Sequence, residues 1–141
     1  MSIEEKIREV ASEGWPKFGF VLEDWAGVDR AVDKTELPAI VCLLIENGEL
    51  DFKNGYCRDS ENVVLAFIDK VPMDADGTDN QTTFESMKGV MKEFISALMA
   101  THYFEPITER IVYNSLYEAL ASNVSGVWCT ITLKEAKGIC L

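Results

Sequence analysis

The sequence is poor in the residues that would mark a metal site or a membrane span. Histidine occurs once, at position 102, so no pair of histidines can bind a metal. The four cysteines, at positions 42, 57, 129 and 140, form no C-x-x-C pair, so we expect no zinc site. No apolar stretch approaches the ~20 residues that a membrane span needs. We therefore expect no metal, no cofactor and no contact with a membrane.

Basic residues are also scarce. Lysine and arginine total 13 against 24 aspartates and glutamates, which gives a formal charge of -11. Nucleic-acid binding depends on basic groups that neutralise phosphates, so we expect no nucleic-acid partner. The first residues, Met-Ser-Ile-Glu-Glu-Lys, contain no apolar signal-peptide core. The expected location is the cytoplasm.

Motifs for common chemistry are missing as well. There is no G-x-x-x-x-G-K-[ST], no G-x-G-x-x-G and no G-x-S-x-G. Asp74, Asp76 and Asp79 suggest a calcium loop, but Gly77 stands at loop position four, where an EF-hand needs its glycine at position six. His102, at the end of a predicted helix, fits a structural or surface role. We predict no catalytic, cofactor-binding or metal-binding residue, and we expect that the protein is not an enzyme.

The sequence does contain ample material for a core. Hydrophobic residues make up 48% of its 141 residues, with seven phenylalanines, four tyrosines and three tryptophans. This supply and length predict a single folded domain over residues 1–141. Cys42 and Cys129 lie in apolar runs and are expected to be small core residues.

Two helices are predicted from capping signals and spacing. Ser2-Ile-Glu-Glu5 has the form of a capping box and begins a short amphipathic helix over 2–13. Thr82 and Glu85 form a second capping box and begin a long helix that runs to about residue 102. Its apolar positions recur at three- and four-residue steps: Phe84, Met87, Met91, Phe94 and Leu98. A helix of this length, about 30 Å, can lie across a whole sheet.

Extended segments alternate with turns. We predict strands over 17–22, 38–45, 62–70, 107–117 and 126–133, with 49–58 as a short edge strand or an excursion. The run 38–45 is continuously apolar and is expected to be buried on both faces. Asn47-Gly48 suggests a type I′ turn, and Asn54-Gly55 marks another turn. The segment 23–36 is interpreted as an acidic loop, and 115–121 could alternatively form a helical turn.

These elements follow the order α-β-β-β-α-β-β. Consecutive strands that are joined by short turns favour antiparallel pairing. The expected fold class is therefore α+β: a mostly antiparallel sheet of four to five strands, with the short N-terminal helix and the long helix, about 82–102, packed on one face.

The order of several segments resembles a known group of proteins. The segments are Leu37-Pro-Ala-Ile40, Ala66-Phe-Ile-Asp-Lys70, Met91-Lys-Glu-Phe-Ile-Ser-Ala-Leu98, Tyr113-Asn-Ser-Leu-Tyr117 and Asn123-Val-Ser-Gly-Val-Trp-Cys-Thr-Ile-Thr-Leu133. In this order they resemble phage-like proteins from prophage regions of Bacteroides-type bacteria, which are similar to the tail-terminator and head–tail joining class. The resemblance covers most of 37–133.

The resemblance implies a non-enzymatic structural role in virion assembly. Members of that class are α+β proteins that form rings, so it implies a homo-oligomer with phage tail or head proteins as further partners, and a virion component. Trp25, Tyr113 and Tyr117 are our candidates for interface residues, although ordinary packing explains them equally well. Two other hypotheses stay open: a small-molecule-binding module or unrecognised enzyme, and an acidic adaptor that meets a basic partner.

Overall fold

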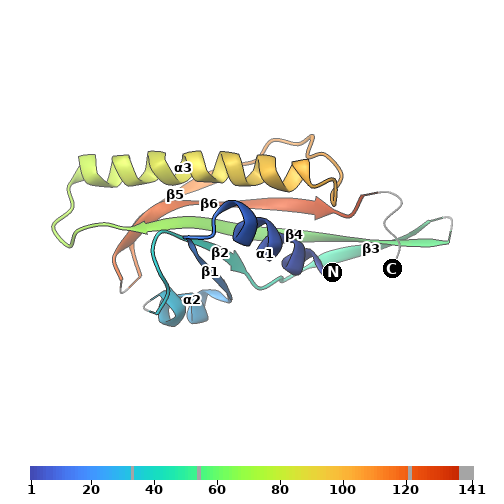
Figure 1. Ribbon diagram of the computed structural model, residues 1–141, viewed down its shortest axis with the longest axis horizontal. Coiled ribbons are helices and arrows are strands. Elements are labelled where there is room, and N and C mark those ends of the chain that lie inside the picture. The colour runs from blue at the N-terminus through green and yellow to red at the C-terminus, as the bar shows by residue number, and fades with distance from the viewer. Residues whose placement is uncertain (33, 54, 121, 137–141) are drawn as a thin grey trace.

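A six-stranded sheet and three helices make up the described chain (Figure 1). The computed structural model describes residues 1–32, 34–53, 55–120 and 122–136. Within them the elements are α1 (Ile3–Gly14), β1 (Gly19–Glu23), α2 (Trp25–Val32), β2 (Ala39–Leu43), β3 (Gly48–Lys53), β4 (Tyr56–Lys70), α3 (Gly77–Ala100), β5 (Tyr113–Ala119) and β6 (Val124–Lys134). The predicted α+β class is confirmed.

The sheet has the strand order β1-β2-β4-β6-β5, and β3 pairs with the remaining part of β4. Every pairing is antiparallel except that of β1 with β2, which is parallel. The mostly antiparallel sheet is thus confirmed, but it has six strands rather than four to five. The additional strand is β3, in the region where we expected either an edge strand or an excursion.

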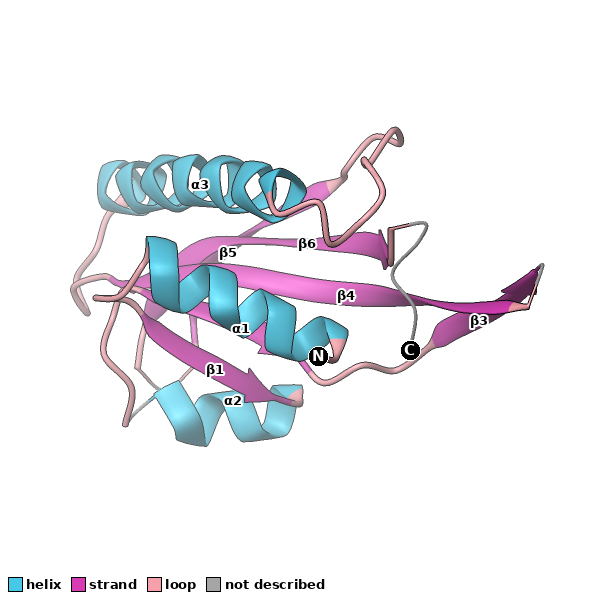
Figure 2. Cartoon of the chain, turned by 45° about the vertical axis from the view of Figure 1, so that its right-hand side comes forward, coloured by secondary structure: helices cyan, strands magenta, loops and turns pink. Residues whose placement is uncertain are grey.

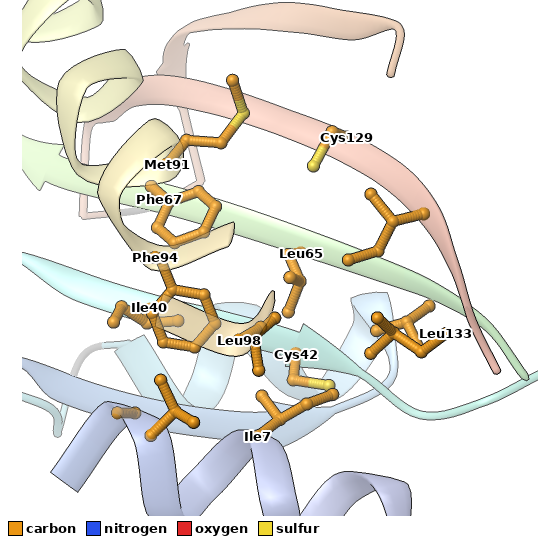
Figure 3. Packing of buried hydrophobic residues seen from close by; sticks show 14 of the residues in the cluster. Ile7, Ile40, Cys42, Leu65, Phe67, Met91, Phe94, Leu98, Cys129 and Leu133 are labelled. Atoms are coloured by element: carbon orange, nitrogen blue, oxygen red, sulfur yellow. The ribbon is translucent and has the colours of Figure 1, made fainter. Parts of the chain in front are cut away.

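The main core lies between one face of the sheet and the helices α1 and α3 (Figures 1 and 2). Phe94 of α3 is fully buried, and its ring centroid lies 5.2 Å from that of Trp15 and 5.6 Å from that of Phe67. Figure 3 shows Phe67 and Phe94 among aliphatic side chains and the thiols of Cys42 and Cys129. The prediction that the long helix packs on one face of the sheet is confirmed.

The two core cysteines also behave as predicted. Burial raises the pKa of the Cys42 thiol to about 12 and that of Cys129 to about 11. Both thiols therefore stay protonated at neutral pH and act as small apolar groups. Cys140 lies outside the described residues.

The long helix begins earlier than predicted. It starts at Gly77, because the side chain of Asp76 accepts the Asp79 N–H at 2.9 Å while Asp79 accepts the Asp76 N–H at 3.2 Å. This reciprocal pair is a capping box made of two aspartates. The predicted start at Thr82 was wrong, since that pattern lies inside the helix, and the helix ends at Ala100 rather than at 102.

The interpretation of 23–36 as a loop was also wrong. Asp24 accepts the Gly27 N–H at 2.7 Å and so begins the short helix α2. Val28 and Val32 of this helix join a second, smaller cluster of buried residues with Ala39 and Ile68. This cluster packs α2 against the face of the sheet opposite to α1 and α3, so the helices do not all lie on one face (Figure 2).

One of the two predicted turns is misplaced. Gly48 is the first residue of β3, and no positive φ is found at Asn47 or Gly48, so the type I′ turn predicted there was wrong. Gly55, with φ 79°, occupies the tight turn between β3 and β4. The second turn prediction is therefore confirmed at Gly55, while Asn54 lies outside the described residues. At the edge of the sheet, β5 is extended over Tyr113–Ala119, so the helical alternative is wrong, and the strand predicted over 107–117 begins six residues later than expected.

Two glycine substitutions test this packing. A Cβ at position 126 of β6 would lie 1.9 Å from the Phe67 carbonyl oxygen of β4, whereas a Cβ at position 89 of α3 would meet no atom within 4 Å. We expect Gly126→Ala to lower the free energy of unfolding by about 1–3 kcal/mol through overpacking. Gly89→Ala should raise it by about 0.5–1 kcal/mol, because alanine favours a helix interior. Urea denaturation of both variants measures the two effects, and equal effects would contradict the β4–β6 contact.

Candidate interaction surface

The β3–β4 hairpin extends beyond the rest of the described molecule (Figure 1). β4 pairs with β6 from Ser60 to Lys70, but its first residues, Tyr56 to Asp59, pair only with β3. The hairpin therefore leaves the sheet as a two-stranded arm past the ends of α1 and α3 (Figure 2). We call residues 48–61, apart from Asn54, the arm.

The arm exposes large apolar side chains. Leu50 is 61% exposed, Phe52 73% and Tyr56 58%. Leu50 stands opposite Asp59 and Phe52 opposite Cys57. Because side chains alternate between the two faces of a strand, Leu50 and Phe52 lie on the same face as Val63, Leu65 and Phe67, which form the main core. The apolar face of the sheet thus continues beyond the helices that cover it.

A buried ion pair holds the base of the arm against α1. Lys6 Nζ lies 3.1 Å from Glu135 Oε2, and their side chains are only 4% and 7% exposed. The other oxygen of Glu135 accepts the Asp59 N–H at 2.8 Å. Lys6 Nζ also lies 5.5 Å and 5.6 Å from the ring centroids of Tyr103 and Phe104. The pair therefore joins α1, the start of β4 and the residue that follows β6.

A second carboxyl group at this base is poorly accommodated as an anion. Burial, followed by the hydrogen bond and the charge of Glu4, raises the pKa of Glu61 from its ordinary value of 4.5 to about 8. Asp59 and Glu135 add further negative charge around it. Within the described chain, Glu61 Oε1 is buried without a hydrogen-bond partner. A protonated Glu61 fits this environment better than a carboxylate does.

The three predicted interface residues are in different situations. Tyr113 and Tyr117 lie on β5, at the edge of the sheet, and are 41% and 47% exposed. Their rings pack 6.2 Å and 6.1 Å from that of Phe84 on α3. Trp25 begins α2, at the other side of the sheet, and its side chain lies outside the described part of the structure. The two tyrosines therefore lie together against Phe84. The role of all three residues in an interface stays a prediction.

The arrangement offers little to a metal or a deeply bound ligand. Among the described residues, no three His, Cys, Asp or Glu side chains are grouped so that they could hold a metal ion. The cavities include an open groove of about 450 Å³ between residues 105–111 and β6, and one of about 440 Å³ between α1 and residues 15–20. None of the described helices combines the length and hydrophobicity of a membrane span.

Comparison with known proteins gives no further guidance. No protein-family model matches the sequence, and no curated protein matches it significantly.

The arm could be predicted from the sequence in part, and the contacts at its base could not. The alternation of Leu50 and Phe52 with charged residues, followed by Gly55, is the pattern of a hairpin and would have located the arm. Its exposure depends on where the helices end. Lys6 and Glu135 are 129 positions apart, and no local pattern could have paired them.

Glu61 gives a pH test of this site. Its raised pKa means that the folded protein binds a proton more tightly than the unfolded chain does. Stability from this group is therefore complete below about pH 4.5 and is lost as the pH rises to about 8. We expect Glu61→Gln, which keeps the shape without the charge, to raise the melting temperature at pH 8.5 and to leave it nearly unchanged at pH 4.5.

A matched control removes the effect of overall charge. Glu46→Gln deletes one negative charge at an exposed position, so the difference between the two variants isolates the environment of Glu61. Thermal unfolding followed by circular dichroism between pH 4.5 and 8.5 measures it. A difference that does not change with pH would show that Glu61 titrates normally in the folded protein.

Proposed function

We propose that this protein is a non-enzymatic structural component of a phage-type neck or tail, which works by associating with copies of itself and with tail or head proteins. The observation that carries the proposal is the arm, which presents Leu50, Phe52 and Tyr56 to solvent. Large apolar side chains on a projecting hairpin cost solubility, and protein contacts are their usual use. The order of segments over 37–133 supports the phage-type assignment.

The position of exposed groups fits the needs of a ring. Identical subunits close a ring through head-to-tail contacts, and each subunit then needs two different surfaces. The arm supplies one. The β5 edge, with Tyr113 and Tyr117 beside the exposed Val112, supplies a second on the other side of the sheet. Edge strands are ready templates for pairing with another chain.

The competing functions have weaker support. A ligand held between helix and sheet would need space that Phe67, Phe94 and Trp15 occupy. The open grooves along β6 and beside α1 are other places for a small molecule. An acidic adaptor role would draw on the charge of -11, but such a charge also serves plain solubility.

Sedimentation velocity over a wide concentration range tests the proposal. We expect species larger than the 15.8 kDa monomer. Phe52→Ser should shift the distribution towards the monomer, because it removes an exposed apolar contact. Met73→Ser, at a position that is 84% exposed and away from the arm, is the matched control and should change nothing. A protein that stays monomeric throughout and binds neither tail-tube nor portal protein from the same genome would contradict the proposal.

A further inference from the structure

The outer edge of β3 is available for strand pairing. In the described part of the chain, β3 pairs only with β4. The Asn47 carbonyl accepts the Asn62 N–H on the β4 side, and backbone groups alternate in direction along a strand. The even-numbered residues Gly48, Leu50 and Phe52 therefore direct their N–H and C=O groups away from β4, towards solvent.

A second copy of the same strand can use these groups in one favourable register. In antiparallel pairing across a two-fold axis at Asp51, Leu50 of each copy stands opposite Phe52 of the other. Leu50 and Phe52 are then a hydrogen-bonded pair, and the two copies exchange four backbone hydrogen bonds. On the core-side face the four side chains form one apolar patch, which covers the groups that the helices leave exposed.

The charges on the other face match in this register. Glu49 stands opposite Lys53 of the second copy, and Lys53 opposite its Glu49, so two attractive cross-strand pairs form. Asp51 meets its own copy at the axis, and Arg58, which stands opposite Asp51 on β4, is already paired with Glu105, so this position is repulsive and the two Glu49–Lys53 pairs must outweigh it. Moving the axis to Leu50 would instead place Glu49 opposite Asp51, which is repulsive.

We propose that the partner of the β3 edge is a second copy of this chain, paired antiparallel through Gly48–Lys53 with its two-fold axis at Asp51. This contact rests on the proposed self-association, and it assigns the arm to a two-fold contact between copies instead of to the head-to-tail contacts of a ring. A two-fold contact of this kind pairs two subunits, or joins two rings face to face when head-to-tail contacts elsewhere close each ring.

A charge exchange tests the register. Glu49→Lys and Lys53→Glu each turn both attractive pairs into repulsive ones, so each variant should associate about tenfold more weakly or worse. Mixed together, the two variants regain both attractive pairs and should form heterodimers. The double variant Glu49→Lys/Lys53→Glu should associate like the unchanged protein. Both substituted positions, Glu49 and Lys53, have exposed side chains on the arm, and circular dichroism checks that the fold is kept.

Disulfide trapping tests the axis itself. Residues that face each other in a non-hydrogen-bonded antiparallel pair have Cα atoms about 4.5 Å apart, within the range of a disulfide. In a Cys57→Ser background, Asp51→Cys should cross-link to a dimer on mild oxidation. Glu49→Cys, which lies opposite position 53 of the partner, should not.

The outcomes separate this contact from the proposed function. Unchanged association of both single charge variants, or equal cross-linking at positions 49 and 51, would overturn the β3 contact and leave self-association through another surface in place. A monomer at every concentration would overturn self-association as a whole. Selective cross-linking at position 51 together with rescue in the mixture would establish the register.

Discussion

The pairing of β4 with β6 determines the arrangement of the rest of the molecule. It runs without interruption from Ser60–Lys134 to Lys70–Val124, and it places Val63, Leu65 and Phe67 in line with the inward side chains of β6. A one-residue slip would turn all of these side chains to the opposite face. Along one edge β4 pairs with β2 and, at its first residues, with β3, while β6 pairs with β5 on its other side. Since β4 is longer than its neighbours, its first residues extend beyond β6 and form the arm with β3.

Periodicity predicted most of the fold, because strong patterns reflect burial. The five residues of β2 are all buried, although the predicted strand 38–45 was too long, since Leu44 and Ile45 lie beyond it and are exposed. The stripe of Phe84, Met87, Met91, Phe94 and Leu98 lies in the core as expected. The prediction failed where tertiary contacts outweigh local pattern. Among its described side chains, α2 has two buried apolar ones in an acidic segment, and its stability comes from packing Val28 and Val32 on the sheet. Two capping patterns precede the stripe of α3, one at Asp76 and one at Thr82. The helix is capped by Asp76, which comes first in the chain, and the pattern at Thr82 lies inside it.

The candidate surface could be predicted less well, since it depends on where elements end in space. Leu50 and Phe52 belong to a strand pattern that is equally typical of a covered edge, and only the positions of α1 and α3 leave them exposed. The contacts at the base of the arm could be predicted even less well. They join Lys6, Asp59 and Glu135 from three distant parts of the chain. A buried ion pair of this kind adds little net stability but penalises arrangements that leave one charge alone, so it serves to fix the direction in which the arm leaves the sheet.

The acidic character of the chain restricts where copies of it can meet. With a net charge of -11, two subunits repel each other once their surfaces approach within the screening length, about 8 Å at physiological ionic strength, while salt screens the repulsion at larger separations. A contact between copies must therefore be locally balanced in charge. On one face of β3, Lys53 matches Glu49 of a second copy, and Asp51 stands opposite Arg58, which itself pairs with Glu105, while the other face carries Leu50 and Phe52. The complementary charges of Glu49 and Lys53 and the exposed apolar area thus coincide on the strand whose backbone groups point outward, and this coincidence favours β3 over other surfaces for a contact between copies.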